Sequence, residues 1–436
     1  MRLRWPICFV ACVALAAAVP QSTLSAPAQE ITFTSTQLNP VQEQEWARNT
    51  LLKGFEDEAN IRVRFIGDVA GPYIDRLLAE AKAGRGSVDV TGTLQGDFPL
   101  LVAEGAVRDV APLLRQLEGR RDRTFIPDLV RSGQIGGIQS FVPWMQATYL
   151  IAASKQAMQH FPRDRNPQEM TYDDLLQWGE NIRQATRQRR LGFPAGPTGL
   201  YGRFLHGYVY PSFTGSQVKK FKSAEAAEMW RYLRRLWGVT HPSSFLYNFM
   251  NEPLLLGEVW VAWDHVARLL PALRERPNDF VILPSPAGPR GRSFLAVIAG
   301  LGVPRNSPNP EGAERLIEYL TRPRTQVVTL QGAAFFPTVR EASGTVPTGG
   351  LRVMAEGVAA QATARDARTA LLPIGLGARS GEFVPLYVDT FREIAVQGKN
   401  IPDVLAAQAR KLEDLYRVMN AVCPPPDPQE RPCKPD

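Results

Sequence analysis

The sequence predicts an α/β protein built from more than one domain. Strand-like and helix-like segments alternate from residue 31 to residue 90, which is the order found in parallel sheets with covering helices. A long, mainly helical stretch follows, and strand-like sequence returns only near Phe280. The length of 436 residues also exceeds the roughly 100 to 200 residues of one ordinary domain, so two or three domains are expected.

The composition is that of a soluble globular protein. Hydrophobic residues make up 44% of the chain and charged residues 21%, values that exclude a disordered or fibrous protein. The formal net charge is +7, and it falls to +5 if the two arginines near the N-terminus are removed with the leader described next. So small a surplus lacks the concentrated basic surface of a nucleic-acid-binding protein, and no nucleic-acid partner is expected.

Residues 1–28 have the layout of a secretory signal peptide. Two arginines precede an apolar run of about 11 residues, Phe9–Val19, and small residues end the segment at Ala28. A membrane-spanning helix needs roughly 20 apolar residues, so we expect cleavage after Ala28 and a periplasmic or secreted protein. Lipid attachment at Cys12 is the alternative, although the apolar run would then follow the modified cysteine instead of preceding it.

The segment after the leader is expected to form a parallel α/β unit. Its expected elements are a strand over Ile31–Ser35, a helix up to about Asn60, a strand over Ile61–Ile66, a helix over Tyr73–Ala83 and a strand over Val88–Val90. Ligands of such sheets sit beyond the carboxyl ends of the strands. The polar turns Thr36–Pro40 and Thr91–Asp97 would meet at that edge.

The pattern changes after Phe141–Trp144, where helical sequence predominates. Thr171 followed by Asp173 and Asp174 predicts a helix start, because the hydroxyl can cap the first turn and the acids suit its dipole. The remaining expected elements are helices over Ala224–Trp237, Pro253–Leu270, Pro310–Thr321 and Asp403–Met419, and apolar strand-like segments over Phe280–Leu283 and Phe294–Val303.

Eight short pieces in this order carry a family resemblance. They are Leu52–Glu56, Val88–Val90 with Asp97–Phe98, Val142–Pro143, Thr171–Leu176, Leu283–Pro284 with Gly288–Pro289, Leu301–Ser307, Asn309–Ala313 and Gly332–Thr338. In this sequence, their order resembles that of the extracellular solute-binding proteins that serve ABC importers, in particular the sugar-binding branch. The resemblance covers about residues 30 to 345.

The resemblance implies a periplasmic-binding-protein-like α/β fold, in which two discontinuous lobes enclose a ligand cleft. The implied division is a signal peptide at 1–28, a first lobe over 29–142 and 291–345, a second lobe over 143–290 and 346–422, and a proline-rich tail over 423–436. It also implies capture of a carbohydrate or carbohydrate-like solute by lobe closure, with delivery to a membrane permease by a monomer.

Enzyme and metal signatures are absent from the sequence. There is no Gly-x-Ser-x-Gly, His-Glu-x-x-His, phosphate-loop or dinucleotide motif, and the four histidines are scattered without ligand spacing. We therefore expect neither catalysis nor a cofactor or metal site. An extracellular glycan hydrolase with Asp97 and Asp264 as its carboxylates is one alternative. A binder of carboxylates, peptides or polyamines is another.

A sugar site needs flat aromatic faces and planar polar groups that grip hydroxyls. Such side chains occur after the expected strands, at the expected crossing between lobes and in the aromatic segments of the middle region. The expected ligand-binding residues are Gln37, Asn39, Gln95, Asp97, Trp144, Gln146, Tyr201, Trp263, Asp264 and Arg292.

Each of these assignments has a structural alternative. The polar turns contain residues that favour turns in any protein. Trp144 can equally pack at the hinge, and one of Trp260 and Trp263 is expected to be core. Arg292, with Arg290, either clamps an anionic group of the solute or lies in a solvated hairpin. Trp263 is expected on the cleft wall, on one face of the Pro253–Leu270 helix.

Only two of the four cysteines lie after the leader, at Cys423 and Cys433. In an oxidising compartment the simplest expectation is one disulfide between them, and two free thiols are the alternative. The tail from Cys423 to Asp436 has six prolines and no apolar periodicity. We therefore expect the disulfide to matter little to the lobes and the tail to add no core.

Overall fold

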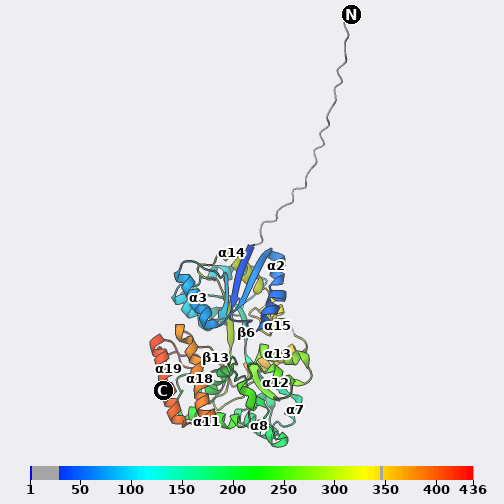
Figure 1. The fold of residues 1–436 in the computed structure, drawn as a ribbon, viewed down its shortest axis with the longest axis vertical. Coiled ribbons are helices and arrows are strands. Elements are labelled where there is room, and N and C mark those ends of the chain that lie inside the picture. The colour runs from blue at the N-terminus through cyan, green and yellow to red at the C-terminus, as the bar shows by residue number, and fades with distance from the viewer. Residues whose placement is uncertain (2–28, 344–346, 436) are drawn as a thin grey trace.

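The computed structural model describes Met1, residues 29–343 and residues 347–435, and it has an α/β fold of two lobes. In Figure 1 one lobe lies above the other, with chain segments passing between them. The expected leader, with Cys12 and the cleavage after Ala28, lies outside the described residues. No helix in the described part combines the length and the apolar character needed to span a membrane.

The first lobe is built on a five-stranded sheet. Its strands, in spatial order, are β2 (Ile61–Gly67), β1 (Gln29–Ser35), β3 (Val90–Leu94), β12 (Val297–Gly302) and β6 (Val142–Ala147). β1 runs parallel to β2 and β3, whereas β12 runs antiparallel to β3 and β6. The opening strand–helix–strand prediction is therefore confirmed. The sheet is completed by strands from much later in the chain.

The core of the first lobe packs aromatic rings through this sheet. Phe33 is fully buried, and its ring centroid lies 5.4 Å from that of Trp144 in an edge-to-face contact. Gly92 lies between them, and a Cβ atom there would come within 2.9 Å of the Trp144 ring. The close approach of β3 to the aromatic core thus requires glycine.

Helices cover both faces of the first sheet. They are α1 (Val41–Trp46), the π-helical turn η1 (Ala47–Leu51), α2 (Lys53–Ala59), α3 (Ala70–Lys82), α4 (Phe98–Ala103), α5 (Ala111–Gly119), α6 (Pro127–Arg131), α14 (Pro310–Leu320), α15 (Pro323–Ala333) and α16 (Arg340–Ser343). α14 begins as predicted, because the side chain of Asn309 accepts a hydrogen bond from the Gly312 amide at 2.9 Å.

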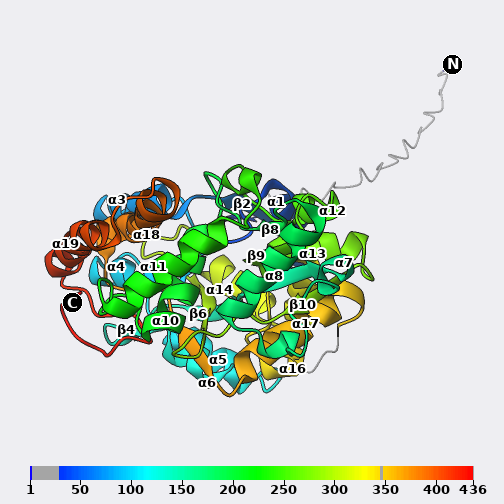
Figure 2. The ribbon, with the colours of Figure 1, turned by 90° about the horizontal axis from the view of Figure 1, so that it is seen from below.

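The second lobe is built on a four-stranded sheet. Its spatial order is β10 (Phe280–Leu283), β7 (Tyr149–Ser154), β9 (Val261–His265) and β8 (Leu191–Gly192). The covering helices are α7 (Lys155–Met158), α8 (Tyr172–Thr186), α9 (Tyr201–Phe204), η4 (Leu205–Val209), α10 (Tyr210–Thr214), α11 (Ala224–Trp237), α13 (Val266–Glu275) and α17 (Gly349–Thr363). Figure 2 shows α8, α10 and α11 closing the lobe from below.

The start of α8 confirms the predicted cap. The hydroxyl of Thr171 accepts a hydrogen bond from the amide of Asp174 at 3.2 Å, and the carboxylate of Asp174 accepts one from the amide of Thr171 at 2.9 Å. These reciprocal bonds form a capping box.

The prediction of one helix over Pro253–Leu270 is wrong. The short helix α12 (Asn251–Leu255) ends before Gly257, whose φ of 71° is left-handed, and the chain then enters strand β9. The run from Val259 to Trp263 is rich in β-branched and aromatic residues, which favour strands. A new helix, α13, starts after His265, whose ring nitrogen accepts a hydrogen bond from the Ala267 amide at 3.2 Å.

The chain crosses between the lobes in three places. It passes from β6 to β7 at Thr148, and from β11 (Arg292–Leu295) to β12 at Ala296. It also passes from α16 to α17, which contacts α13 in the second lobe. The sheets therefore assign β6 to the first lobe, although the expected boundary lay before Pro143, and β11 pairs with β13 (Ala367–Ala370) outside the first sheet.

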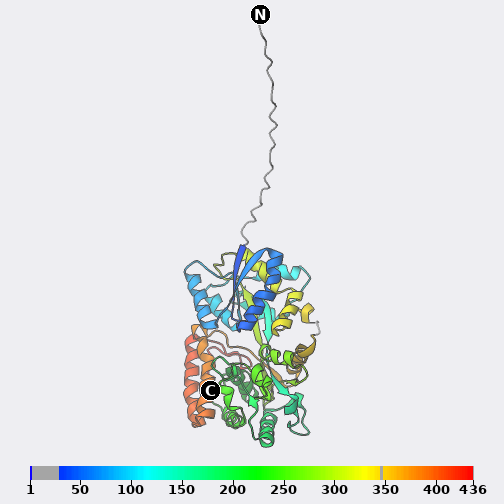
Figure 3. The same cartoon turned by 45° about the vertical axis from the view of Figure 1, so that its right-hand side comes forward.

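The C-terminal region adds helices and a docked tail to the second lobe. Helices α18 (Phe383–Phe391) and α19 (Ile401–Met419) lie side by side along one edge in Figure 3. The expected disulfide is confirmed, with Cys423 bonded to Cys433.

The expectation that the tail adds no core is wrong. Both cysteines are buried, and Asp427 is only 4% exposed. The Asp427 carboxylate accepts hydrogen bonds from the amides of Gln217 and Lys219, the latter at 2.8 Å. The pattern of apolar residues in the sequence cannot predict this docking, because the disulfide-closed loop is held by hydrogen bonds between a carboxylate and backbone amides.

Candidate functional site

Charged and aromatic side chains from both lobes come together where the lobes meet, and we call this group the interlobe cluster. Its members are Glu43, Asp97 and Phe335 from the first lobe, and Tyr149, Arg203, Phe249, His265 and Arg268 from the second. Each member influences the pKa of another or contacts another ring across this region.

The part of the cluster in the first lobe lies at the carboxyl ends of neighbouring parallel strands. Thr36 follows β1 and Thr93 lies in β3, and their hydroxyl oxygens are 3.1 Å apart. The Thr93 hydroxyl donates to the carboxylate of Asp97, which ends the 3-10 turn η2 (Gln95–Asp97). The side-chain amide of Gln37 donates to the Thr36 hydroxyl at 3.2 Å. This is the edge at which the parallel strand order predicts a ligand.

Asp97 lies close to a cation of the other lobe. Burial raises the pKa of Asp97, while the Thr93 hydroxyl and the guanidinium of Arg203 act in the opposite direction. Arg203 belongs to α9 in the second lobe. Asp97 as a residue remains partly exposed.

Glu43 of the first lobe and Arg268 of the second also influence each other electrostatically across the lobes. Burial raises the pKa of Glu43 to about 7, and Arg268 works against this rise. The Arg268 guanidinium carbon also lies 4.4 Å from the centroid of the Phe249 ring, a cation–π contact. Phe249 is 36% exposed, so part of its ring is open beside the cation.

Aromatic rings form the rear of the cluster. Tyr149 stacks on Trp263, with ring centroids 4.7 Å apart and planes 3° from parallel. The rings of His265 and Tyr149 form an edge-to-face contact with centroids 5.1 Å apart. The ring of Phe335, which belongs to the first lobe, has its centroid 5.5 Å from that of His265. Burial, together with Arg268 and Arg203, lowers the pKa of His265 to about 3. The imidazole is therefore neutral at physiological pH, and its acceptor nitrogen is occupied by the cap of α13.

Four of the expected ligand-binding residues lie at the strand ends beside the cluster. Gln37, Asn39, Gln95 and Asp97 are all partly exposed there. Asn39 also positions the chain locally, because its backbone carbonyl accepts a hydrogen bond from the Gln44 side chain at 2.6 Å. These positions are compatible with solute contact from the first lobe.

Three expected aromatic contacts lie in the core instead. Trp144 is fully buried against Phe33, Tyr201 is 3% exposed, and Trp263 is 1% exposed. Tyr201 packs against Phe193 and other rings, and Trp263 packs behind Tyr149 in β9. None of these three rings presents a face to a solute in this structure. Aromatic residues near glycines have the same sequence pattern in a core as beside a ligand.

The remaining expected residues are occupied by protein contacts. Asp264 is fully buried, and its carboxylate accepts hydrogen bonds from the amides of Met250 and His265 at 2.9 and 2.7 Å. Arg292 is 2% exposed; it donates to the Ser285 carbonyl and lies 3.6 Å from Asp366. The side chain of Gln146 donates to the Pro337 carbonyl at 2.7 Å, on the other side of the crossing segments.

Sequence reasoning missed most of the interlobe cluster. The expected set contains only Asp97 of the eight members and lacks Glu43, Tyr149, Arg203, Phe249, His265, Arg268 and Phe335. Arg203 lies in one of the aromatic segments of the middle region, Gly199–Phe204, where nothing in the sequence distinguishes it from an ordinary surface arginine. Arg268 falls within the incorrectly predicted helix Pro253–Leu270, so its position beside the first lobe could not be predicted. Within residues 29–343 and 347–435, no group of three or more His, Cys, Asp or Glu side chains is placed to hold a metal ion.

Comparison with known proteins gives one family and many structural neighbours. The profile described as "Bacterial extracellular solute-binding protein" matches residues 39–327. A search of curated proteins gives no significant match.

Three solved structures illustrate the likeness of fold. Maltose-bound MalE3 of T. maritima is 20% identical, with 89% of this chain and 100% of that chain covered and a TM-score of 0.73. A chitin oligosaccharide binding protein is 14% identical, with 89% and 99% covered and a TM-score of 0.71. UgpB of Mycobacterium tuberculosis, in complex with glycerophosphocholine, is 18% identical, with 90% and 99% covered and a TM-score of 0.69.

Proposed function

This chain belongs to the bacterial extracellular solute-binding proteins, and from that premise we propose that it captures a carbohydrate or carbohydrate-like solute between its lobes for an ABC importer. Delivery to the membrane permease of that importer is part of the proposal. The observation that carries it is the interlobe cluster, because charged and aromatic side chains of both lobes come together at one place. A solute bound there would contact both lobes at once.

The side chains of the cluster suit a ligand with hydroxyl groups. Carboxylates such as Asp97 accept hydrogen bonds, and the guanidinium of Arg203 offers several donors in one plane. The partly exposed Phe249 ring supplies a flat apolar face of the kind that packs on the C–H side of a sugar ring. Maltose and a chitin oligosaccharide, named for two of the structural neighbours, are ligands of this type.

Lobe closure is the proposed mechanism of capture. The lobes close around a solute only to the extent that the solute binds the closed arrangement more tightly than the open one. A ligand hydroxyl group between Asp97 and Arg203 would donate a hydrogen bond to the carboxylate of the first lobe and accept one from the guanidinium of the second lobe. The solute would thereby add to the attraction that the opposite charges already provide across the lobes.

A thermal-shift screen tests the proposal. The full mature protein is heated with neutral mono- and oligosaccharides, sugar phosphates and amino acids, and ligand at 100 times its dissociation constant should add about 2.7 kcal/mol of stability. We expect a shift with at least one sugar class. A shift only with amino acids would overturn the carbohydrate assignment. Cleavage of a glycan during incubation would overturn the binding-protein assignment.

A further inference from the structure

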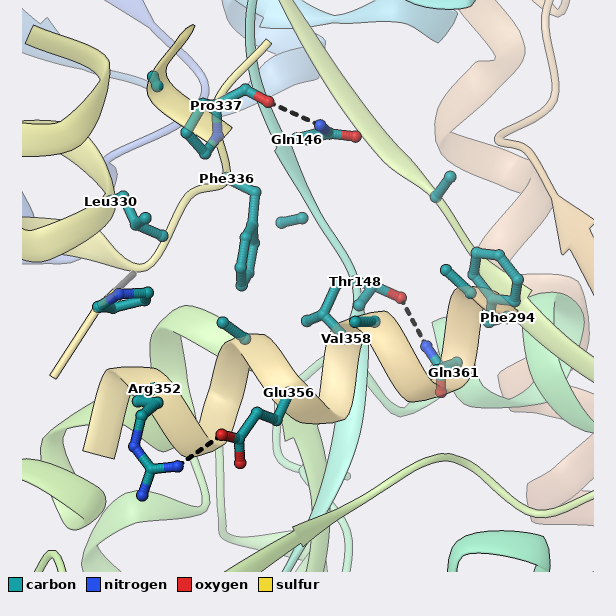
Figure 4. A pocket seen from close by; sticks show the side chains of 17 residues that line it. Gln146, Thr148, Phe294, Leu330, Phe336, Pro337, Arg352, Glu356, Val358 and Gln361 are labelled. Carbon is teal, nitrogen blue, oxygen red and sulfur yellow. Dashed lines mark hydrogen bonds and ion pairs between the residues drawn. The ribbon is translucent and has the colours of Figure 1, made fainter. Parts of the chain in front are cut away.

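A pocket lies behind the crossing segments, and we call it the hinge pocket. Its volume is about 450 Å³, which falls within the range of small-molecule sites, roughly 300 to 1,000 Å³. Figure 4 shows Leu330 and Phe336 of the first lobe on one side and helix α17 of the second lobe on the other. Phe294, from the second crossing, closes a third side.

The lining of the hinge pocket is chiefly apolar. Phe336 and Phe294 contribute rings, and Leu330, Val358 and several alanines of α17 complete the walls. The lining residues also include polar side chains.

The two glutamines of the lining are occupied. The Gln146 side chain donates to the Pro337 carbonyl at 2.7 Å. The Gln361 side chain donates to the Thr148 hydroxyl at 3.0 Å and accepts from the Ser285 amide at 2.9 Å. The Gln361 amide is bonded at both ends and the Gln146 amide donates to the protein, so these groups gain little from a polar ligand and the lining favours an apolar one.

Charged residues occur only at the rim on α17. Arg352 and Glu356 form an ion pair there at 2.5 Å, and both side chains are more than half exposed. Exposed pairs of this kind contribute little to stability and can separate easily. The rim can therefore accommodate a ligand that carries one charged group beside an apolar body.

The hinge pocket and the interlobe cluster lie on opposite sides of the crossing segments. Phe335 contacts His265 in the cluster, whereas the next residue, Phe336, lines the pocket and forms a bridge with Gln146. Likewise Thr148 lines the pocket while Tyr149 belongs to the cluster. Successive side chains of extended backbone point to opposite sides, which accounts for both pairs.

We propose that the hinge pocket is a second ligand site, which takes an apolar aromatic molecule and whose occupancy is coupled to the arrangement of the lobes. The aromatic class follows from the Phe336 and Phe294 rings and from the satisfied polar groups. The coupling follows from walls that belong to both lobes. A ligand that fills the pocket stabilises this arrangement, because rotation of one lobe against the other would move α15 and Phe336 relative to α17. This proposal does not depend on which solute the interlobe cluster binds.

The first test uses 1-anilinonaphthalene-8-sulfonate as the aromatic probe, titrated into the full protein and followed by calorimetry. We expect one saturable site. Ala359→Phe, which places a ring in the pocket from α17, should weaken probe binding at least tenfold. The matched control Ala360→Phe alters the adjacent position of the same helix, which is not among the lining residues, and should bind as the native protein does.

Equal probe affinity in both variants and the native protein would overturn the site. The coupling is tested by hydrogen exchange, measured at Gln95–Asp97 and at α13, which do not line the pocket. Saturating probe should slow exchange there at least threefold. Unchanged exchange with the pocket occupied would overturn the coupling. Both tests give a result even if no sugar binds, so failure of this inference is distinct from failure of the proposed function.

Discussion

At the scale of single residues, opposite charges facing each other across the lobes are the main feature of the site. Asp97 and Glu43 belong to the first lobe, and Arg203 and Arg268 belong to the second. Burial raises the pKa of both acids, because it removes water that would stabilise their charged carboxylate forms. Ligand hydroxyls could replace the lost hydration, which makes these residues the natural targets for substitution.

Asp97→Asn should weaken solute binding without unfolding the protein. The substitution keeps the size of the side chain and removes the charge that accepts hydrogen bonds. Bonds to charged groups contribute about 1.5 to 3 kcal/mol, so the dissociation constant should rise by a corresponding factor in calorimetry. The control is Asp57→Asn on the outer surface of α2, where the carboxylate pairs with Lys53 and both side chains are more than half exposed. Equal affinity in the two variants would remove Asp97 from the site.

The raised pKa of Glu43 predicts a specific pH dependence of stability. The folded protein holds a proton on Glu43 up to about pH 7, whereas the unfolded chain loses it near 4.5. Between these values the folded state binds more protons, so the free energy of unfolding contributed by Glu43 falls as the pH rises. The free energy of unfolding, measured with denaturant from pH 4.5 to pH 7.5, should therefore decline less in Glu43→Gln than in the native protein. The exposed neighbour Glu45 serves as the control, and Glu45→Gln should leave the native profile intact.

At the scale of elements, the segment from α12 through β9 to α13 shows the limit of periodicity as evidence. Leu256, Trp260, Trp263 and Ala267 are spaced four, three and four residues apart, which matches one face of a helix. In the structure two of them flank or lie in a strand. The central position of β9 between β7 and β8 decides the outcome, and local spacing carries no information about such pairing.

Trp263→Ala should cost stability and spare the solute site. The side chain is buried between Tyr149, Phe204 and Tyr208, so its removal leaves a cavity. The free energy of unfolding, measured with denaturant, should fall by about 3 to 5 kcal/mol. Trp263→Phe, which keeps one aromatic ring, should lose clearly less. Loss of binding in a variant of native stability would instead support the original expectation that Trp263 stacks on the solute.

The docked tail makes a second prediction for an element. Replacing both Cys423 and Cys433 by serine should lower the free energy of unfolding by about 2 to 4 kcal/mol, because the unfolded chain regains the freedom of the closed loop. The hydrogen bonds of Asp427 to the Gln217 and Lys219 amides should weaken with it. Faster hydrogen exchange at 216–220 would report that release. Native stability and exchange in the double variant would show that the tail docks without its disulfide.

At the scale of the whole molecule, the prediction from sequence succeeded where the evidence was local. The opening strands, the Thr171 cap, α14 and α19 could all be read from short patterns, and the ordered family pieces indicated two lobes. The partners of Asp97 and Glu43 could not be read in this way. Arg203 and Arg268 influence the pKa of these acids only because two lobes, made of interleaved segments, come to face each other.

This interleaving predicts that the first lobe does not fold until its late strand has been supplied. A chain that ends at residue 290 lacks β12, which lies between β3 and β6 in the first sheet. Such a chain keeps both flanking strands but cannot join them, so we expect calorimetry to show no cooperative unfolding of the first lobe. The control is the same chain supplied through residue 343, which restores β12, α14 and α15 to the first lobe. A cooperative transition in the shorter chain would contradict the expectation.

The late position of β12 in the chain also delays completion of the first sheet during biosynthesis. About two hundred residues separate the end of β3 at Leu94 from the start of β12 at Val297, and a ribosome that adds ~5–20 residues per second needs roughly 10 to 40 s to make them. Throughout that interval β3 has an open edge and the first sheet is incomplete. A nascent chain in this condition has an unfinished first lobe, so the edge of β3 stays open to pairing with other strands until β12 is made.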